Sequence, residues 1–244
     1  SISIFLLLKD YIPKKLHTLS LLSSVLMLIF SIFSARRGGI LVLLLLFAVY
    51  FLMLRSKNRV QTILMYLIFF ISVLFVVNIG IENLEFFNFL SERGFEDNRS
   101  NVDEAMLSQM NSFEIIFGKG LNGRYYLPLI EDDYLNGWRY ISETGFYNFV
   151  LKGGFLMAFT YVLILLISSL KGIFNSKNKI GKVFGYFILI SLVELYPFGI
   201  PMFTFKFLFI WFGVIICSNS KFLNLNDKQI KNYINKNRNL NVKN

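Results

Sequence analysis

Positively charged residues beside or inside apolar runs are the groups in this sequence that could do chemistry. Arg36 and Arg37 form a pair between two apolar runs, and Lys152 and Lys206 lie inside two others. The planar arginine fork matches phosphate oxygens, and partial desolvation strengthens such contacts. Charges inside membrane segments are costly and usually face a bundle interior or a wet cavity. We therefore expect Arg36 or Arg37 to share one outward-facing, positively charged cavity with Lys152 and Lys206, which would suit a phosphate-bearing headgroup.

Two of these features also have simpler interpretations, which stay open. Arg36 and Arg37 could anchor a tight turn at a membrane surface, because long basic side chains snorkel to the headgroups. Glu194 lies near the end of the apolar run that precedes Lys206, so these two residues could form a structural ion pair. The alternative is that Glu194 belongs to the same polar cavity.

The polar stretch between the apolar runs begins with a predicted helix. Segment 101–112 is typical of an amphipathic helix, because Val102, Met106 and Met110 recur every four residues. Ser100 followed by Asp103 resembles a capping box. Arg99 stands just before this helix, and the exposed amides at a helix start favour anions. Arg99 is therefore a candidate ligand-binding residue, with a solvated loop arginine as the alternative.

A glycine-rich segment and a single carboxylate complete the candidate site. The segment Phe117-Gly118-Lys119-Gly120-Leu121-Asn122-Gly123-Arg124 permits tight turns with positive φ. Its Lys119 and Arg124 could contact an acidic or sugar ligand, although the segment is not a Walker A loop. Glu143, where the chain re-enters an apolar run, is a candidate general base or merely an exposed acid. Aromatic residues near it fit either a membrane belt or sugar stacking; they are Trp138, Tyr140, Phe146 and Tyr147.

The composition indicates a membrane protein without a metal or cofactor. Hydrophobic residues make up 55% of the 244 residues, and the mean hydropathy is +0.56, which is more apolar than a soluble domain requires. A single cysteine, Cys217, and a single histidine, His17, exclude a disulfide framework and most zinc and histidine chemistry. The basic residues behind the net charge of +10 lie between apolar runs. This pattern favours the positive-inside rule over nucleic-acid binding.

Apolar runs predict the elements that must position these residues. A membrane span needs about 20 apolar residues. Pro197 and Pro201 divide the last run into two short helices, or into one kinked or re-entrant segment. Residues 1–8 read as the end of a helix that begins earlier. The expected spans, about six in number, are 16–33, 38–54, 60–80, 145–170, 183–196 and 202–218.

The predicted fold is an all-α, polytopic integral membrane helical bundle with a large, partly helical extracytoplasmic loop. Residues 1–80 hold the truncated helix and three spans, 81–144 the loop, 145–218 two to three spans, and 219–244 a tail. Lysine and arginine cluster before the first span, after the second, after the fourth and in the tail. The positive-inside rule places all four clusters, and the C-terminus, in the cytoplasm. The mainly acidic loop then lies outside.

Three motifs together resemble the O-antigen polymerase and ligase family of bacterial membrane proteins. The first is Phe33-Ser34-Ala35-Arg36-Arg37-Gly38-Gly39 leading into an apolar run. The second is a loop with Arg93 and Arg99, a helix, and then Ile116-Phe117-Gly118-Lys119-Gly120-Leu121. The third is Glu143-Thr144-Gly145-Phe146-Tyr147-Asn148-Phe149 followed by Lys152-Gly153-Gly154. The resemblance covers residues 20–170 and would make this chain the C-terminal part of such a protein.

The resemblance implies a metal-independent glycosyl transfer on undecaprenyl-diphosphate-linked oligosaccharides at the outer face of the inner membrane. It implies diphosphate binding by Arg36 or Arg37 and by Arg93 and Arg99, a product such as O-antigen, capsule or exopolysaccharide, and chain-length regulator and flippase proteins as partners. The ligase branch has a functional histidine in the outer loop. This loop has none, and His17 is expected in the cytoplasm, which favours a polymerase over a ligase.

A transporter or flippase component is the competing class. Charges inside apolar segments and broken helices also suit transport. An internal repeat would favour that interpretation, and the sequence contains none that we detect. The long loop also exceeds what a simple connection between transporter helices needs.

Overall fold

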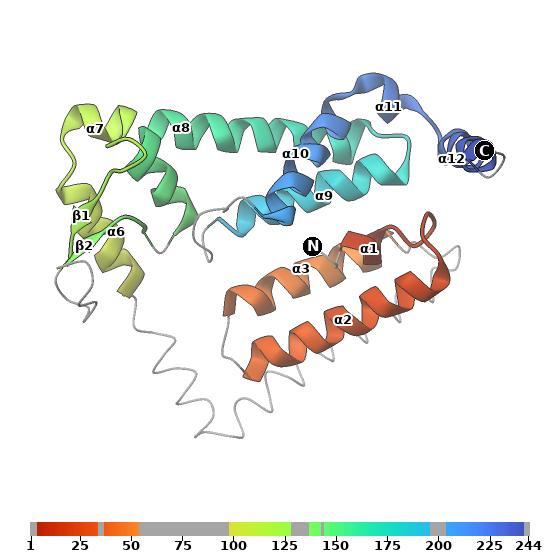
Figure 1. Cartoon of the computed structure of the whole chain (residues 1–244), viewed down its shortest axis with the longest axis horizontal. Coiled ribbons are helices and arrows are strands. Elements are labelled where there is room, and N and C mark those ends of the chain that lie inside the picture. The colour runs from red at the N-terminus through yellow and green to blue at the C-terminus, as the bar shows by residue number, and fades with distance from the viewer. Residues whose placement is uncertain are drawn as a thin grey trace.

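A computed structural model describes residues 4–33, 37–53, 98–127, 137–142, 144–195 and 204–241. Within these ranges the chain is mostly helical, with one two-stranded antiparallel ribbon (Figure 1). The predicted helical character is therefore confirmed for the described part of the chain, and the polytopic membrane bundle stays a prediction. The predicted span at 60–80 lies outside the described residues, as do residues 81–97 of the loop.

The first described helices match the predicted runs closely. A short helix α1 (Ile4–Leu7) is followed by α2 (Lys14–Phe33) and α3 (Arg37–Met53). Helix α2 starts directly after Pro13, whose fixed φ suits the beginning of a helix. The helix predicted at 16–33 thus begins two residues earlier than expected, and the helix predicted at 38–54 lies one residue earlier.

The later helices pack against one another as a group. Helix α8 (Gly145–Leu170) has the predicted bounds and continues as a π-helical turn, η1 (Lys171–Asn175). Helix α9 (Lys179–Val193) starts earlier than the apolar run because the Asn178 side chain accepts a hydrogen bond from Gly181 N. Helix α10 (Phe205–Ser218) follows an N-cap at Thr204. The tail forms two helices, α11 (Ser220–Asn224) and α12 (Asp227–Asn241).

The loop contains two helices where the sequence predicted one. Helix α6 (Asn98–Ser108) ends before the predicted limit, and α7 (Ser112–Phe117) begins a new turn. The separate start has a local cause, because Asn111 and Glu114 form a capping box. Asp103, which the sequence placed in a capping box with Ser100, has a carboxylate that accepts from Ser142 and Thr144. Strands β1 (Tyr125–Tyr126) and β2 (Trp138–Arg139) complete the loop.

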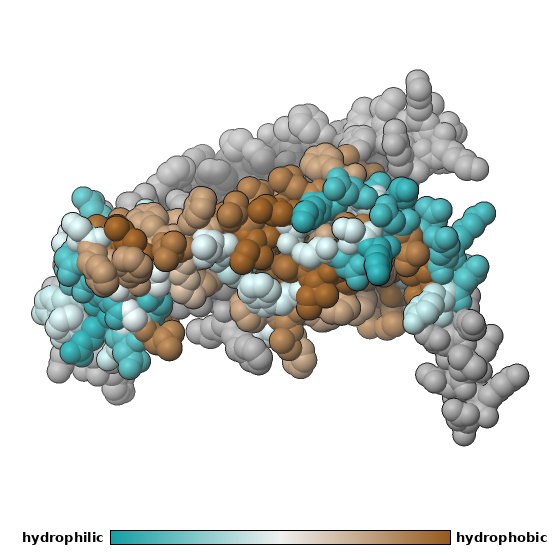
Figure 2. All heavy atoms as spheres, turned by 90° about the horizontal axis from the view of Figure 1, so that it is seen from above, coloured by the Kyte–Doolittle hydropathy of each residue, from teal (hydrophilic) through white to brown (hydrophobic). Residues whose placement is uncertain are grey.

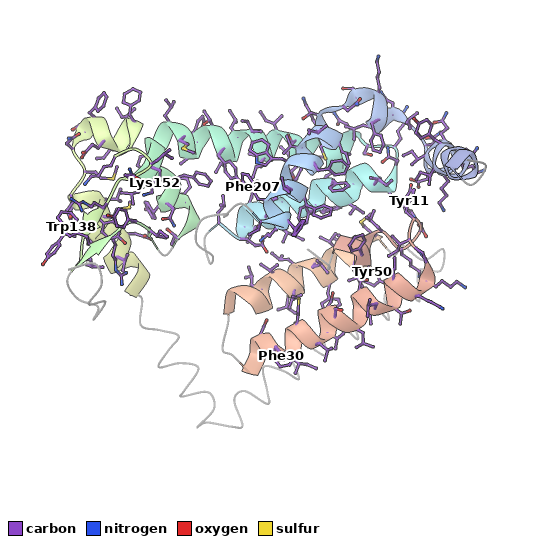
Figure 3. All side chains as sticks on the ribbon, viewed as in Figure 1. Tyr11, Phe30, Tyr50, Trp138, Lys152 and Phe207 are labelled. Atoms are coloured by element: carbon purple, nitrogen blue, oxygen red, sulfur yellow. The ribbon has the colours of Figure 1, made fainter. Side chains whose placement is uncertain are left out.

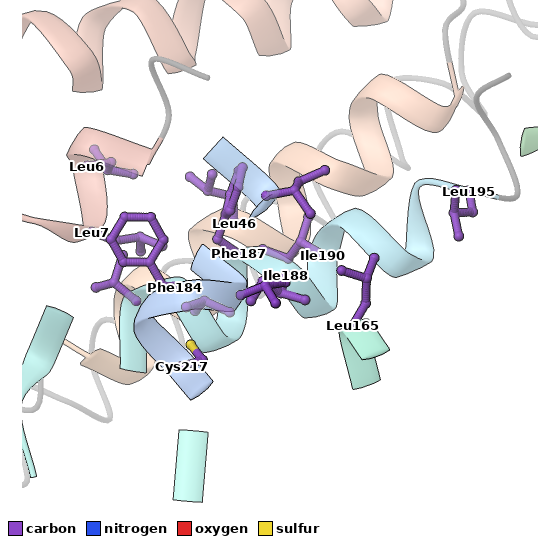
Figure 4. Close-up of a cluster of buried hydrophobic side chains, with 14 of the residues drawn as sticks. Leu6, Leu7, Leu46, Leu165, Phe184, Phe187, Ile188, Ile190, Leu195 and Cys217 are labelled. Atoms are coloured by element: carbon purple, nitrogen blue, oxygen red, sulfur yellow. The ribbon is translucent and has the colours of Figure 1, made fainter. Parts of the chain in front are cut away.

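Two clusters of buried apolar side chains hold these elements. The bundle core joins α1, α3, α8, α9 and α10, and it includes Leu46, Leu165, Phe184 and Ile188 (Figure 4). The loop core joins α6, β1 and the first half of α8, and it includes Val102, Met106 and Met110. The periodic apolar residues predicted for segment 101–112 are therefore buried together. Phe149 of α8 packs against both clusters.

The described elements leave polar surface at two opposite ends. We call the first the loop end; it comprises α6, α7, the β1–β2 ribbon and the first half of α8. We call the second the basic end; it comprises residues 8–13, 176–179, α11 and the start of α12. Figure 1 shows them at the left and right of the molecule. Figure 2 shows mainly hydrophobic surface between hydrophilic ends on the face that it presents.

Helix α8 with its π-helical extension, Gly145–Asn175, is the one helix in the described ranges that is long and apolar enough to cross a membrane. One third of its most apolar window is buried within the protein. Its exposed side chains include Leu156, Phe159 and Leu163. Shorter apolar helical stretches are Leu41–Tyr50 and Phe205–Ser218.

Candidate functional site

A break in helix α8 brings two of the sequence motifs together. Gly154 has φ 69° and ψ −177°, which interrupts the helical hydrogen bonds at this point. The carbonyl of Leu151 instead accepts from Lys119 N at 2.8 Å, and the carbonyl of Lys152 accepts from Gly120 N at 3.1 Å. The backbone of the glycine-rich segment thus satisfies carbonyls that the kink releases. We call this contact between 116–120 and 151–154 the glycine junction.

The glycine junction requires glycine at two positions. A Cβ on Gly118 would lie 2.5 Å from the Lys152 carbonyl oxygen, and a Cβ on Gly154 would lie 2.0 Å from that of Ile116. Both residues also have positive φ, which L side chains rarely adopt. Gly120 has positive φ as well, but open space surrounds it. The predicted positive-φ turns in this segment are confirmed at Gly118 and Gly120.

Two lysines lie at the glycine junction, and each is held by a carbonyl. Lys152 Nζ donates to the carbonyl of Gly123 at 2.8 Å and lies 5.8 Å from the centre of the Tyr140 ring. Lys119 Nζ donates to the carbonyl of Gln109 at 2.7 Å. These contacts fix both ammonium groups without neutralising them, because a carbonyl carries no net charge.

The β1–β2 ribbon presents aromatic rings and one arginine beside the junction. Tyr126 pairs with Trp138 across the ribbon, with ring centres 5.5 Å apart in an edge-on arrangement. The guanidinium carbon of Arg124 lies 4.5 Å from the centre of the Trp138 ring, which is a cation–π distance. Tyr126, Trp138 and Tyr140 remain more than one third exposed. Figure 3 shows Trp138 and Lys152 at the same end of the molecule.

The opposite side of the ribbon is anchored in the protein. Tyr125 is fully buried in the loop core, and its hydroxyl donates to the carbonyl of Ile141 at 3.0 Å. The Gln109 side chain bonds to both backbone groups of Tyr126, at 2.7 and 2.8 Å. The alternation along the ribbon therefore buries Tyr125 and exposes Tyr126, as expected for a strand with one covered face.

Three cations of this end have neutral partners. Across the described ranges, Lys119, Lys152 and Arg124 contact carbonyl groups or aromatic rings and no carboxylate. Their positive charge is therefore left for a ligand to neutralise. Sequence reasoning named these three residues, but it did not predict that they would be collected around one backbone junction.

A buried carboxylate organises the chain around the candidate base. Asp103 is 6% exposed, and its carboxylate accepts hydrogen bonds from the hydroxyl groups of Ser142 and Thr144. Asn148 holds the same turn, because its side chain accepts from Ser142 N at 2.6 Å and donates to the carbonyls of Ser142 and Thr144. Glu143 itself lies outside the described residues. Its two neighbours in sequence are thus fixed by Asp103 and Asn148.

Sequence reasoning missed Asp103 because its spacing from Ser100 matched a helix cap. The signal that could have revealed its role is the run of small polar residues at the end of the loop. Ser142, Thr144 and Asn148 surround Glu143 in sequence, and such side chains often bond to backbone or carboxylate groups where a chain turns into a helix.

Glu194 and Lys206 form an ion pair between the end of α9 and the start of α10. Glu194 is mostly buried and Lys206 is partly exposed. This contact agrees with the structural ion pair that the sequence suggested as one interpretation of these two residues. This pair lies near the turn that holds Glu143, because Gly145 N donates to the carbonyl of Leu195 at 2.7 Å. Lys206 and Lys152 thus have different partners, and no described contact joins them.

Most of the predicted arginine sites lie at residues that the structure does not describe, or describes only in their backbone. Arg36 and Arg93 are outside the described residues, as is Glu143. Arg37 and Arg99 lie in the first turns of α3 and α6, and the structure describes only their helical backbone. Whether these arginines share a cavity with Lys152 and Lys206 therefore stays a prediction.

The basic end contains a second group of charged residues with different chemistry. Asp10 and Lys179 form an ion pair, and the Tyr11 hydroxyl donates to the carboxylate of Asp227. The hydrogen bond from Lys179 holds the pKa of Asp10 below its usual value. Burial, followed by the bond to Asp227, raises the pKa of Tyr11. A cavity of about 190 Å³ opens beside the Asp10–Lys179 pair, and it contains none of the predicted site residues.

The described part of the chain has no group of three or more residues that could hold a metal ion. Comparisons of the chain with protein-family models, with curated proteins and with solved structures gave no match. The function proposed for this chain therefore rests on the geometry of the site.

Proposed function

We propose that this chain serves in the polymerisation of undecaprenyl-diphosphate-linked oligosaccharide repeat units at the outer face of a bacterial cytoplasmic membrane. The observation that carries the proposal is the group of cations at the loop end. Lys119, Lys152 and Arg124 have no carboxylate partner in the described ranges, and exposed aromatic rings lie beside them. A ligand that combines phosphate charge with sugar rings complements this surface.

The proposal includes a membrane position for the protein. The long apolar helix Gly145–Asn175 and the exposed apolar residues of α2 and α10 supply surface that acyl chains could cover. The loop end then faces outward and the basic end faces the cytoplasm. The close packing of residues 8–13, 176–179 and 219–227 at one end agrees with their common placement under the positive-inside rule.

The proposed reaction transfers the growing glycan to the next repeat unit. The acceptor hydroxyl oxygen attacks the anomeric carbon of the donor sugar, and the bond from that carbon to the diphosphate breaks. Glu143 takes the hydroxyl proton, and the lipid diphosphate leaves with the bonding electrons. Fixed cations stabilise the charge that develops on the leaving group. Lys152 and Arg124, with the predicted sites at Arg36, Arg37, Arg93 and Arg99, would supply that charge.

Glycan analysis of cells tests the proposed reaction. A strain that lacks the full-length protein should lose long polysaccharide chains on a gel and keep single repeat units. Complete loss of surface glycan would contradict a polymerase and support a flippase component. Long lipid-linked chains that never reach the surface acceptor would support a ligase.

Charge-neutralising variants test the residues. Lys152→Gln and Arg124→Gln should each reduce the polymerisation rate about ten- to a hundredfold, because a hydrogen bond to a charged group contributes about 1.5–3 kcal/mol. Lys221→Gln is the matched control, since Lys221 is an exposed lysine at the basic end and its loss changes the net charge equally. Equal chain lengths in all three variants, at equal protein abundance, would leave the loop-end cations without a role.

A further inference from the structure

Helix α7 carries a group of large apolar side chains that the protein leaves exposed. Phe113 is 68% exposed, Ile116 and Phe117 are each 50% exposed, and Leu121 in the following turn is 86% exposed. These residues belong to the polar loop rather than to a predicted span. Their exposure in water would be unfavourable, since fully burying one such side chain contributes about 1.5–3 kcal/mol. Something outside the described residues is therefore expected to cover them.

These exposed apolar side chains form one surface, and the neighbouring structure fixes its position. Phe113, Ile116 and Phe117 have the spacing of one helix face. The Phe113 and Phe117 ring centres lie 4.8 Å apart. The capping box of Asn111 and Glu114 fixes the start of this helix. The glycine junction fixes its end, where Gly118 and Gly154 allow the backbones of α7 and α8 to touch.

The surface continues into the most apolar part of the protein. The glycine junction places the end of α7 against Gly154, and the residues that follow Gly154 in α8 are exposed and apolar: Phe155, Leu156, Met157 and Phe159. Figure 2 shows hydrophobic surface over the loop end that runs on into the apolar middle of the molecule. The same helix is the one described element that could cross a membrane. One environment can therefore cover both surfaces.

We propose that α7 and Leu121 insert into the outer leaflet of the membrane that α8 crosses, with phospholipid acyl chains as the covering partner. The insertion rests on the proposed membrane position. It sets the height of the glycine junction, because α7 and the junction are joined without a linker. Lys119, Lys152 and Arg124 are thereby held at the level of lipid phosphates, where the diphosphate of a lipid-linked substrate also lies.

Lipid accessibility of single labelled positions tests the insertion. Spin labels at positions 113, 117 and 121 of the full chain, in nanodiscs of phosphatidylcholine and phosphatidylglycerol, are exposed to oxygen and to a water-soluble nickel chelate. Oxygen concentrates in the acyl region and the chelate in water. Oxygen should therefore increase the relaxation rate of all three labels more than the chelate does. Glu104, exposed on α6, is the aqueous control position, and Leu163, exposed on α8, is the lipid control position.

The control positions separate the two proposals. Nickel accessibility at 113, 117 and 121 equal to that at 104 would overturn the insertion while the membrane position stands. Nickel accessibility at 163 would overturn the membrane position itself. Labels at 113, 117 and 121 shielded from both reagents would indicate a cover of protein, from a partner, a second copy or a segment of this chain outside the described residues, which also contradicts the insertion. Native Cys217 is buried, and the unsubstituted chain measures its background labelling.

Discussion

The loop end and the basic end both gather cations, and they differ in what those cations contact. At the basic end Lys179 is paired with Asp10, and the Asp227 carboxylate accepts from Tyr11 and from Lys179 N. At the loop end Lys119 and Lys152 donate to carbonyls, and Arg124 lies on an aromatic ring. Lys231 at the basic end also lies over a neutral partner, the Tyr11 ring, at 5.5 Å. The contrast therefore concerns Lys179, whose charge is compensated by Asp10, whereas Lys119, Lys152 and Arg124 have no carboxylate partner in the described ranges.

The two ends are also built differently. At the basic end Asn178 donates to the carbonyls of Phe222 and Leu225, and Lys177 N donates to the carbonyl of Leu223 at 2.9 Å. At the loop end the glycine junction brings two backbones together at positions where a Cβ would collide with backbone atoms. A backbone cannot move aside as the end of a flexible side chain can, and the variants below are chosen to expose this contrast.

The largest expected effect follows from filling the glycine junction. Gly154→Ala places a Cβ 2.0 Å from the Ile116 carbonyl oxygen, so α7 must separate from α8. The positive φ adds about 1–3 kcal/mol of backbone strain. We expect rapid proteolysis of the segment 117–124 in the purified protein and loss of long glycan chains in cells.

Gly120→Ala is the control for this variant, because Gly120 has positive φ and open space around it. It isolates the backbone strain from the collision. Equal proteolysis rates for Gly154→Ala and Gly120→Ala would show that close backbone contact is unimportant at the loop end.

An intermediate effect is expected from the buried carboxylate. Asp103→Asn keeps the volume of the side chain and removes the charge that the Ser142 and Thr144 hydroxyls contact. Hydrogen bonds to charged groups contribute about 1.5–3 kcal/mol, and thermal unfolding in detergent measures the loss. The polymerisation rate should fall with it, because these residues flank Glu143.

Glu104→Gln serves as the neighbouring control, since Glu104 is exposed on the same helix. A stability change as large for Glu104→Gln as for Asp103→Asn would contradict a specific role for the network. A stability loss with an unchanged polymerisation rate would separate Asp103 from the reaction.

The smallest effect is expected at the basic end. The pKa of Asp10 is lowered in the folded protein, so the ion pair with Lys179 stabilises the fold above the ordinary pKa of a carboxyl group. That contribution is lost as the pH falls through the lowered value. Both side chains are substantially exposed, and such pairs contribute about 0.2–1 kcal/mol.

Asp10→Asn should therefore lower the thermal midpoint slightly at pH 7, and the difference from the wild type should shrink as the pH falls through the lowered pKa of Asp10. A constant difference between the two proteins from pH 7 to pH 3 would rule out the ion pair as its cause. Polymerisation should be unaffected at neutral pH, which marks the functional contrast between the two ends.

The helices were predictable because their cause is local. Apolar runs of sufficient length gave α2, α3 and α8 within two residues of their observed bounds, and the periodicity of Val102, Met106 and Met110 indicated a buried helix face. The break between α6 and α7 was not predicted, because the periodicity of Val102, Met106 and Met110 suggested one continuous helix, although Asn111 and Glu114 have the spacing of a capping box.

The candidate site was predictable in its residues and unpredictable in its arrangement. Lys119, Arg124 and Lys152 were chosen for charge and position in the chain. Their meeting depends on backbone hydrogen bonds from Lys119 and Gly120 to residues more than thirty positions away, which no local pattern encodes. The network around Asp103 has the same origin, because its partners follow it by about forty residues.

Phe149 packs against both clusters of buried side chains, and this position affects which part of the protein unfolds first. Because α8 contributes to both clusters of buried side chains, it couples two units that each have their own interior. Such units open with different free energies, and hydrogen exchange resolves them. The loop unit has fewer buried apolar residues than the bundle unit, so it should exchange first. Opening of the loop unit would then separate Phe149 from the loop core while the bundle core stays packed.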